Sequence, residues 1–249
     1  MCLILVAWRV HGDFPLVVAA NRDEFYARPT LPAGRWPEAP AIIAGRDLQA
    51  GGTWLGITDG GRFAAVTNVR EPGVPQGARS RGELTRDFLL GEATAEEAAT
   101  AVAGRDYSGF NLLLADRDGL SYVSNRDGPP RPLPPGIYGV SNHLLDTPWP
   151  KLASAKARFA AALAQLPDTG AFFAILADDE IVPDEHLPAT GVPLEWERLL
   201  SAIFVRSATY GTRASTVLTV GRSGATCLEE RAFGPEGRPL QSSVISTGV

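Results

Sequence analysis

Cys2 is the residue of this chain whose type and position most directly suggest chemistry. An ionised cysteine thiol is a strong nucleophile, and a thiol at the start of a chain has its own α-amine beside it as a general base. The α-amine has a pKa of about 7.7–8.0, which suits proton transfer at neutral pH. We therefore predict that Cys2, after removal of Met1, is the nucleophile of a hydrolase that uses its own α-amine as the base.

Cys2 also has a simpler interpretation, because an unpaired cysteine often serves as a small buried apolar residue. The chemical hypothesis therefore depends on polar clusters elsewhere that accompany strand-like runs. They are Asn21 to Glu24, Thr67 to Arg70, Ser141 to His143 and Tyr210 to Arg213. Each cluster alone is typical of turns and surface ion pairs. Together with Cys2, they predict amide, carboxylate and guanidinium groups gathered at one sheet edge.

Several common classes of site are excluded by the absence of their motifs. The sequence has no GxxxxGK[ST] phosphate loop, no GxGxxG after a strand, no HExxH and no complete GxSxG. Gly139 to His143 begins like GxSxG but ends on a histidine. The three histidines lack the spacing of metal ligands, so we predict no metal site.

Composition and charge indicate a folded chain that binds neither nucleic acid nor a bilayer. The net charge is −5, whereas nucleic-acid binding depends on clustered cations. No apolar run approaches the about 18 residues of a membrane span, so we predict no stable membrane insertion. The only cysteines, Cys2 and Cys227, form no disulfide or zinc pattern, and residues 3–8 are too short a run for a signal peptide. We predict a cytoplasmic protein with one domain, residues 1–249, and leave its oligomeric state open.

The elements that must position these groups are predicted as hairpins with helices between them. Apolar runs joined by turn residues predict four hairpins, over residues 2–20, 53–69, 111–125 and 214–231. Helical spacing predicts helices at residues 81–90, 95–103, 151–166, 171–177 and 194–203. Hairpins favour antiparallel sheets, so the pattern predicts an α+β layered fold.

Many of these segments together resemble the NRDE family, which includes the transport and Golgi organisation protein 2 of animals and bacterial relatives. The similarity extends from residue 2 to about residue 220. It rests on the following segments, in order: Cys2, residues 18–30 (VAANRDEFYARPT), residues 51–56 (GGTWLG), Thr67-Asn68, residues 81–84 (RGEL), residues 109–112 (GFNL), residues 138–142 (YGVSN), residues 147–149 (TPW) and residues 210–213 (YGTR).

The NRDE family in turn is similar to N-terminal-nucleophile hydrolases of the penicillin acylase and bile-salt hydrolase type. That resemblance implies a four-layer αββα sandwich of two largely antiparallel sheets between helices. It implies the following catalytic residues: Cys2 as nucleophile, Asp23 as the carboxylate that orients the α-amine, Asn68 and Asn142 at the oxyanion positions and Arg213 as the site arginine. We predict as substrate-binding residues Asn21, Arg22, Trp54, Arg70 and His143.

Two functions compete on this basis. The leading prediction is a cysteine hydrolase that cleaves a linear amide or related acyl bond of a small molecule and requires no cofactor. The alternative is a non-catalytic carrier or chaperone of a haem or acyl ligand, since the resemblance implies a role in haem trafficking or acyl-lipid metabolism. In that case Cys2 or a histidine would ligate iron, and Arg22, Arg70 or Arg213 would bind propionates or a phosphate.

Overall fold

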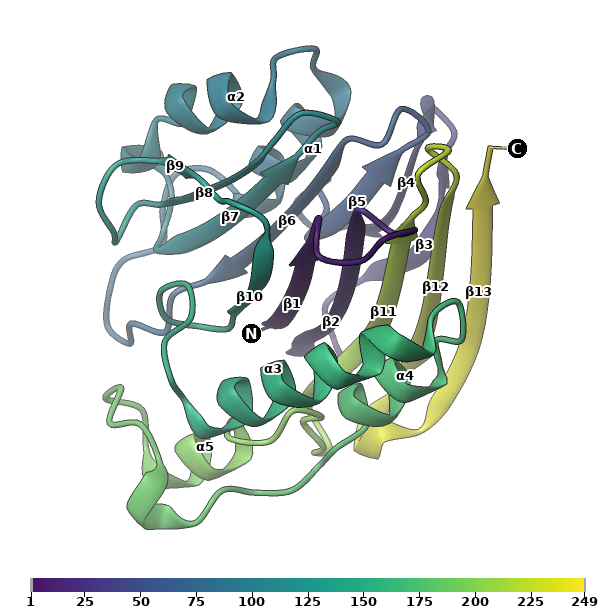
Figure 1. Ribbon diagram of the computed structural model, residues 1–249. Coiled ribbons are helices and arrows are strands. Elements are labelled where there is room, and N and C mark those ends of the chain that lie inside the picture. The colour runs from purple at the N-terminus through teal and green to yellow at the C-terminus, as the bar shows by residue number, and fades with distance from the viewer. Residues whose placement is uncertain (1, 249) are drawn as a thin grey trace.

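Six antiparallel strands form the sheet that carries Cys2. The structure, a computed structural model, describes residues 2–248. The strand order in this first sheet is β10-β1-β2-β11-β12-β13 (Figure 1). The strands are β1 (Cys2–Trp8), β2 (Leu16–Phe25), β10 (Gly136–Val140), β11 (Tyr210–Val220), β12 (Thr226–Phe233) and β13 (Pro239–Thr247).

Seven antiparallel strands form the second sheet, in the order β3-β4-β5-β6-β7-β8-β9. They are β3 (Thr30–Trp36), β4 (Ala39–Asp47), β5 (Leu55–Thr58), β6 (Phe63–Asn68), β7 (Phe110–Ala115), β8 (Leu120–Ser124) and β9 (Arg131–Pro132). The two sheets pack face to face through a core that includes Ile4, Val18, Ile57 and Leu113.

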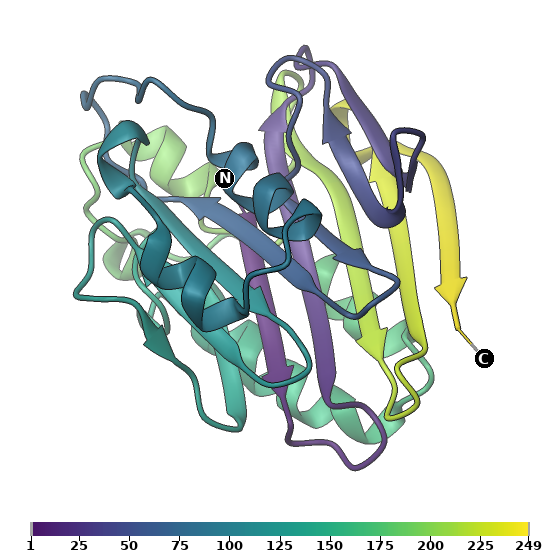
Figure 2. The same cartoon turned by 90° about the horizontal axis from the view of Figure 1, so that it is seen from above.

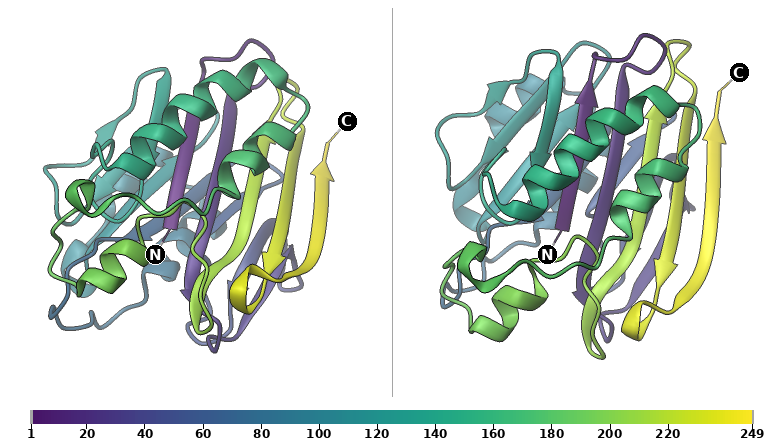
Figure 3. Two further views of the ribbon diagram at one scale, coloured as in Figure 1. Left: turned by 90° about the horizontal axis from the view of Figure 1, so that it is seen from below. Right: turned by 60° about the horizontal axis from the view of Figure 1, so that its bottom comes forward.

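Helices cover the outer face of each sheet. The helices are α1 (Arg81–Leu90), α2 (Ala95–Ala101), α3 (Pro150–Ala162), α4 (Gly170–Leu176) and α5 (Leu194–Leu199). Figure 2 shows α1 and α2 over the second sheet, and Figure 3 shows α3 and α4 across the first. Leu3 and Leu5 pack with Phe159 of α3, whereas Ile42 and Val66 pack with Phe88 of α1. The predicted αββα sandwich is confirmed.

Strand β1 shows how sequence pattern and layer match. All seven of its residues are buried, because one face packs on the second sheet and the other on α3 and α4. A strand that is covered on both faces has no solvent side, so its sequence is a continuous apolar run rather than an alternating one. The even-numbered residues of β1 face the second sheet and the odd-numbered residues face the helices.

The four predicted hairpins and five predicted helices are present, with ends that shift by a few residues. Two boundaries were wrong in a way that matters for the site. Strand β2 continues to Phe25, because β1 pairs with it as far as Arg22 and β11 pairs with it through Phe25. Tyr210 to Arg213 begins strand β11 instead of following a strand.

Strands β3, β4, β9 and β13 were not predicted as strands. Strand β3 contains Pro32 and alternates poorly, and β13 is mostly exposed at a sheet edge. Such strands depend on backbone pairing more than on an apolar pattern, so periodicity does not identify them. Among residues 2–248, no helix is long and apolar enough to cross a membrane.

Candidate active site

Cys2 lies where strand β1 begins, at the end of the interface between the sheets. It pairs with Arg22 of β2, and both side chains lie on the face that meets the second sheet. The Ser141 hydroxyl donates a hydrogen bond of 3.0 Å to the Cys2 carbonyl, which attaches the end of β10 to the start of β1. The Cys2 side chain is 8% exposed and lines a cavity of about 440 Å³.

Strand alternation separates the residues of the segment Asn21 to Asp23. Because successive side chains point to opposite faces of a sheet, Asn21 and Asp23 lie on the helix side of β2 and Arg22 on the other. The Asn21 amide donates to the carbonyls of Leu176 and Ile203 at 2.8 and 2.9 Å. Asn21 therefore ties α4 and a following loop to the sheet, and it does not line the cavity.

Asp23 is a buried carboxylate that stands at the cavity wall. Thr212 donates a hydrogen bond of 2.7 Å to Asp23 Oδ1, and the Tyr210 hydroxyl donates to the Asp23 carbonyl at 3.2 Å. The register of β11 against β2 shifts between Thr212 and Ala214, so Arg213 is the extra residue of a bulge. A bulge re-aims a side chain. It lets Thr212 face Asp23 while Arg213 lines the cavity.

Burial and nearby charges act together on the pKa values of Cys2 and Asp23. Burial and the Asp23 charge raise the pKa of the Cys2 thiol, while Arg22 and a hydrogen bond from the Asp23 backbone lower it. Burial also raises the pKa of Asp23, against the nearby cations of Lys151 and Arg22 and the Thr212 hydrogen bond. In both groups burial outweighs these partners, so each pKa stays above its ordinary value, and the nearby cations limit the rise.

Lys151 is a buried ammonium whose charge interacts with Asp23 and Cys2, and the sequence analysis did not identify it. It lies in the first turn of α3, and its Nζ donates to the carbonyls of Leu200 and Ala202 at 2.8 and 3.5 Å. Burial lowers its pKa to about 8, while the Asp23 and Cys2 charges act in the opposite direction. Nothing in the sequence distinguished it from Lys156, except a place beside Pro150 at the start of a helix.

The two predicted oxyanion residues meet each other beside Cys2. Asn68 ends strand β6 of the second sheet, and Asn142 follows strand β10 of the first. Asn142 Nδ2 donates to Asn68 Oδ1 at 2.9 Å, and Asn142 Oδ1 lies 3.1 Å from Ser141 Oγ, whose single proton is shared between this oxygen and the Cys2 carbonyl. Ser141 therefore joins this amide pair to the Cys2 backbone. Asn142 Nδ2 also donates to the Asn68 carbonyl at 3.4 Å, a longer contact, and Asn142 is fully buried behind Asn68 without lining the cavity itself.

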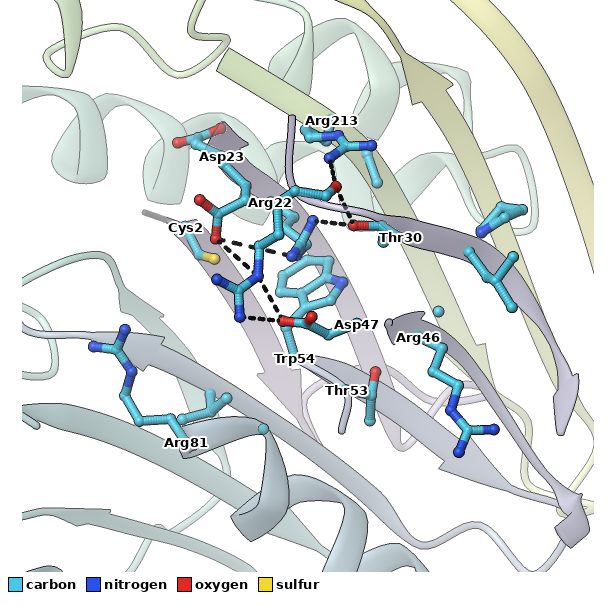
Figure 4. A pocket seen from close by; sticks show the side chains of 18 of the residues that line it. Cys2, Arg22, Asp23, Thr30, Arg46, Asp47, Thr53, Trp54, Arg81 and Arg213 are labelled. Carbon is cyan, nitrogen blue, oxygen red and sulfur yellow. Dashed lines mark hydrogen bonds and ion pairs between the residues drawn. The ribbon is translucent and has the colours of Figure 1, made fainter. Parts of the chain in front are cut away.

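The cavity collects six of the ten predicted site residues: Cys2, Arg22, Asp23, Trp54, Asn68 and Arg213. In Figure 4, Cys2 and Trp54 lie between Arg213 and Arg81, which are at opposite ends of the drawn pocket. Arg22 Nη1 donates to Thr30 Oγ1 at 3.4 Å, and Arg22 Nη2 lies 3.9 Å from Glu24 Oε2. Arg213 donates to the carbonyls of Phe25 and Arg28.

Arg70 and His143 lie outside this cavity. Arg70 forms a buried ion pair of 2.6 Å with Glu197, and its guanidinium stacks 4.9 Å from the Trp149 ring centroid. His143 is exposed, with Nδ1 2.9 Å from the Thr147 hydroxyl. Both line a separate hollow with Trp149 and His186. Arg70 still acts on the site at a distance, because its charge interacts with Asp23.

Thr212, Ser141 and Arg81 are further site residues that were not predicted individually. Thr212 and Ser141 stood in two of the polar clusters, and Arg81 opened one of the resembling segments. Their roles became visible only through contacts with Asp23, with Cys2 and with the cavity. Within residues 2–248, no cluster of three or more His, Cys, Asp or Glu side chains is arranged to hold a metal ion.

The chain matches a family and several relatives of known name. The family model described as Transport and Golgi organisation 2 matches residues 1–235. The Bos taurus Transport and Golgi organization protein 2 homolog is 39% identical over 242 residues, covering 88% of this chain and 87% of the relative. The Homo sapiens homolog is 37% identical over 240 residues, with the same coverage. The Drosophila melanogaster protein is 28% identical over 244 residues, covering 84% and 83%.

Two solved structures share the fold. The Caenorhabditis elegans N-acylethanolamine-hydrolyzing acid amidase ortholog superposes with a TM-score of 0.55 at 15% identity, covering 87% of this chain and 92% of the other. A mutant conjugated bile acid hydrolase from Clostridium perfringens gives a TM-score of 0.54 at 9% identity, covering 98% and 92%. Both the family and the N-terminal-nucleophile hydrolase fold expected from the sequence are confirmed.

Proposed function

The chain belongs to the transport and Golgi organisation 2 family. We propose that it is a cysteine hydrolase that cleaves linear amide or related acyl bonds in small molecules, and the proposal is based on this family, the fold and the geometry around Cys2. One observation carries the proposal. The Cys2 thiol, the Asp23 carboxylate and the Asn68 amide line one cavity, and Asn142 is hydrogen-bonded to Asn68. A nucleophile, an anion to hold the base and donors for an oxyanion are thus within one site.

The reaction begins with attack by the Cys2 thiol on the substrate carbonyl. The thiol proton passes to the α-amine of Cys2, which is free once Met1 is removed, and Sγ forms a bond to the carbonyl carbon. Asp23 compensates the ammonium that results, and Thr212 holds the carboxylate in place through its 2.7 Å hydrogen bond. Arg22, paired with Cys2 across the strands, favours the thiolate.

The tetrahedral intermediate places negative charge on the former carbonyl oxygen. The amides of Asn142 and Asn68 donate to it, and one such donor is worth roughly 2.7–4 kcal/mol in comparable sites. The C–N bond then breaks, and the departing amine takes the proton from the Cys2 ammonium. Water, with the α-amine again as base, hydrolyses the thioester, releasing a carboxylic acid and restoring the thiol.

The test combines mass spectrometry with turnover. The intact mass of the purified protein should lack Met1, and a panel of N-acyl amides should give an acyl adduct on Cys2 and a released acid. We expect Cys2→Ala to abolish turnover and the adduct, while Cys227→Ser, at the other cysteine, retains both. Retained Met1 in an active protein, or unchanged turnover in Cys2→Ala, would refute the mechanism.

A second candidate function is a carrier that binds an acyl ligand without cleaving it. This function is supported by the several arginines that line the cavity, among them Arg22 and Arg213, because guanidinium groups bind anionic ligands well. Ligand binding that persists in Cys2→Ala, with no turnover by the unaltered protein, would support the carrier over the hydrolase.

Haem fits this cavity less well than an acyl anion does. Among residues 2–248 no histidine lines the cavity, so Cys2 is the only side chain there that commonly ligates haem iron.

A further inference from the structure

The cavity beside Cys2 is lined by more cations than anions. Four carboxylates line it, at Asp23, Glu24, Asp47 and Glu230. Six arginines line it, at Arg22, Arg28, Arg46, Arg79, Arg81 and Arg213. In a chain whose net charge is −5, this is a local reversal of sign.

Four of these arginines have carboxylate partners. Arg28 pairs with Asp47 at 2.7 Å, and Arg79 pairs with Glu83 at 2.9 Å. Arg46 pairs with Glu38, which stands outside the cavity. The fourth, Arg22, lies 3.9 Å from Glu24. Their charges are therefore largely compensated within the protein.

Arg81 and Arg213 are different. Among the ion pairs of residues 2–248, none involves either guanidinium within 4 Å. Arg213 is bound to two backbone carbonyls, whereas Arg81 has one such contact, from Nη1 to the Gly109 carbonyl at 3.1 Å. Burial lowers the pKa of Arg81, and the Cys2 charge acts against this shift. Arg81 thus combines partial burial, few contacts and electrostatic coupling to Cys2.

Arg81 is held in position by a close backbone contact. It is the first residue of α1, and the next residue, Gly82, accepts a hydrogen bond of 3.2 Å from the Thr53 backbone. A Cβ on Gly52 would lie 2.4 Å from the Gly82 carbonyl, so only glycine permits this approach. The segments Gly51 to Thr53 and Arg81 to Glu83, distant in sequence, therefore place the start of α1 rigidly at the cavity.

We propose that the ligand of this cavity carries an anionic group, a carboxylate or a phosphate, and that Arg81 recognises it. A guanidinium presents five N–H donors in a planar fork that matches both groups, and one donor of Arg81 is engaged by Gly109. The inference rests on one part of the proposed function, namely that ligands reach Cys2 through the cavity. The group would lie between helix α1 and Cys2, within the field of both Arg81 and Arg213.

The test compares alkylation of Cys2 by iodoacetate and by the neutral iodoacetamide, at constant ionic strength, in a Cys227→Ser background read by mass spectrometry. In each case the Cys2 sulfur displaces iodide, so the ratio of the two rates reports anion recognition. We expect Arg81→Gln to lower the iodoacetate/iodoacetamide ratio about tenfold, the size of one charge-assisted hydrogen bond. The control, Arg46→Gln, removes a compensated arginine of the same cavity and should leave the ratio unchanged.

Inorganic phosphate distinguishes the two anions. If the site takes phosphate, added phosphate should slow iodoacetate in the Cys227→Ser protein but not in Arg81→Gln; if it takes carboxylate alone, acetate should compete and phosphate should not. Three results would overturn the proposal. The iodoacetate/iodoacetamide rate ratio could be the same with and without Arg81, it could fall equally in Arg46→Gln, or Cys2 could fail to react with iodoacetate. The alkylation assay needs no turnover, so the two proposals can fail separately. An anion preference at Cys2 without hydrolysis would refute only the hydrolase function. Cys2-dependent hydrolysis without the anion preference would refute only the recognition of an anion by Arg81.

Discussion

Replacing Lys151 with methionine should change how the stability of the protein depends on pH. The Lys151 ammonium is buried in the first turn of α3 among the carbonyls of Leu200 and Ala202. Burial lowers its pKa from 10.5 to about 8. Methionine has a similar length and fills the same space without a titrating group.

The sign follows from the two pKa values. Between about pH 8 and pH 10.5 the unfolded chain holds a proton on Lys151 that the folded protein has released, so raising the pH favours the folded state. The full difference between the two pKa values corresponds to about 3 kcal/mol, all of it opposing folding below pH 8. Between about pH 7 and about pH 9.5 the linkage relation recovers roughly 2 kcal/mol of this.

Urea unfolding at these two pH values provides the measurement. The free energy of unfolding of the unaltered protein, minus that of Lys151→Met, should increase by roughly 2 kcal/mol as the pH is raised. Lys156→Met is the matched control, because Lys156 lies on the same helix and its ammonium pairs with Asp146 at 2.8 Å near the surface. Taking the difference between variants removes the titration of other groups.

Two results would refute the reasoning. If the difference between the unaltered protein and Lys151→Met stayed constant with pH, Lys151 would titrate alike in the folded and unfolded states. If the difference fell as the pH rose, the electrostatic attraction of Asp23 would outweigh burial, and the folded-state pKa of Lys151 would lie above that of the unfolded chain.

Further outcomes follow from the same structure. Arg70→Met should destabilise the protein by about 3–5 kcal/mol in urea, since Glu197 is left buried and unpaired, whereas the double change Arg70→Met with Glu197→Leu should cost much less. Glu230→Gln should be at least as stable as the unaltered protein at neutral pH. Burial raises the pKa of Glu230, so its stabilising contribution is present below the pKa of the unfolded state and is lost as the pH rises through the pKa of the folded state. Equal pH dependence of the free energy of unfolding in the two proteins would contradict this. In an active protein, Asn142→Ala should lower kcat by about 10²–10³, and a kcat within threefold of the original would exclude Asn142 as an oxyanion donor. Thr212→Val should move the acidic limb of the pH–rate profile upward, because Asp23 loses a hydrogen bond to its charged form; an unmoved limb would separate Asp23 from catalysis.

The sandwich itself was predictable because its signals are local. Strand β1 is a continuous apolar run, hairpin turns contain Asp and Gly, and α1 begins with the Ser80 and Glu83 capping box. Each of these depends on neighbouring residues alone. The edge strand β13 escaped prediction because most of its residues face solvent, where apolar periodicity is lost.

For the site, the sequence by itself determined which chemical groups are available: a thiol, carboxylates, amides and guanidinium groups in segments that resemble a known family. Which of them share a cavity was decided only by tertiary structure. The alternation of side chains along β2 places Asn21 and Arg22 on opposite faces of the sheet, and the bulge at Arg213 allows Thr212 to contact Asp23. A close contact between Gly52 and Gly82 placed Arg81, and burial selected Lys151 over Lys156 as the perturbed lysine. These choices depend on register and on distances between segments far apart along the chain, and local sequence carries neither quantity.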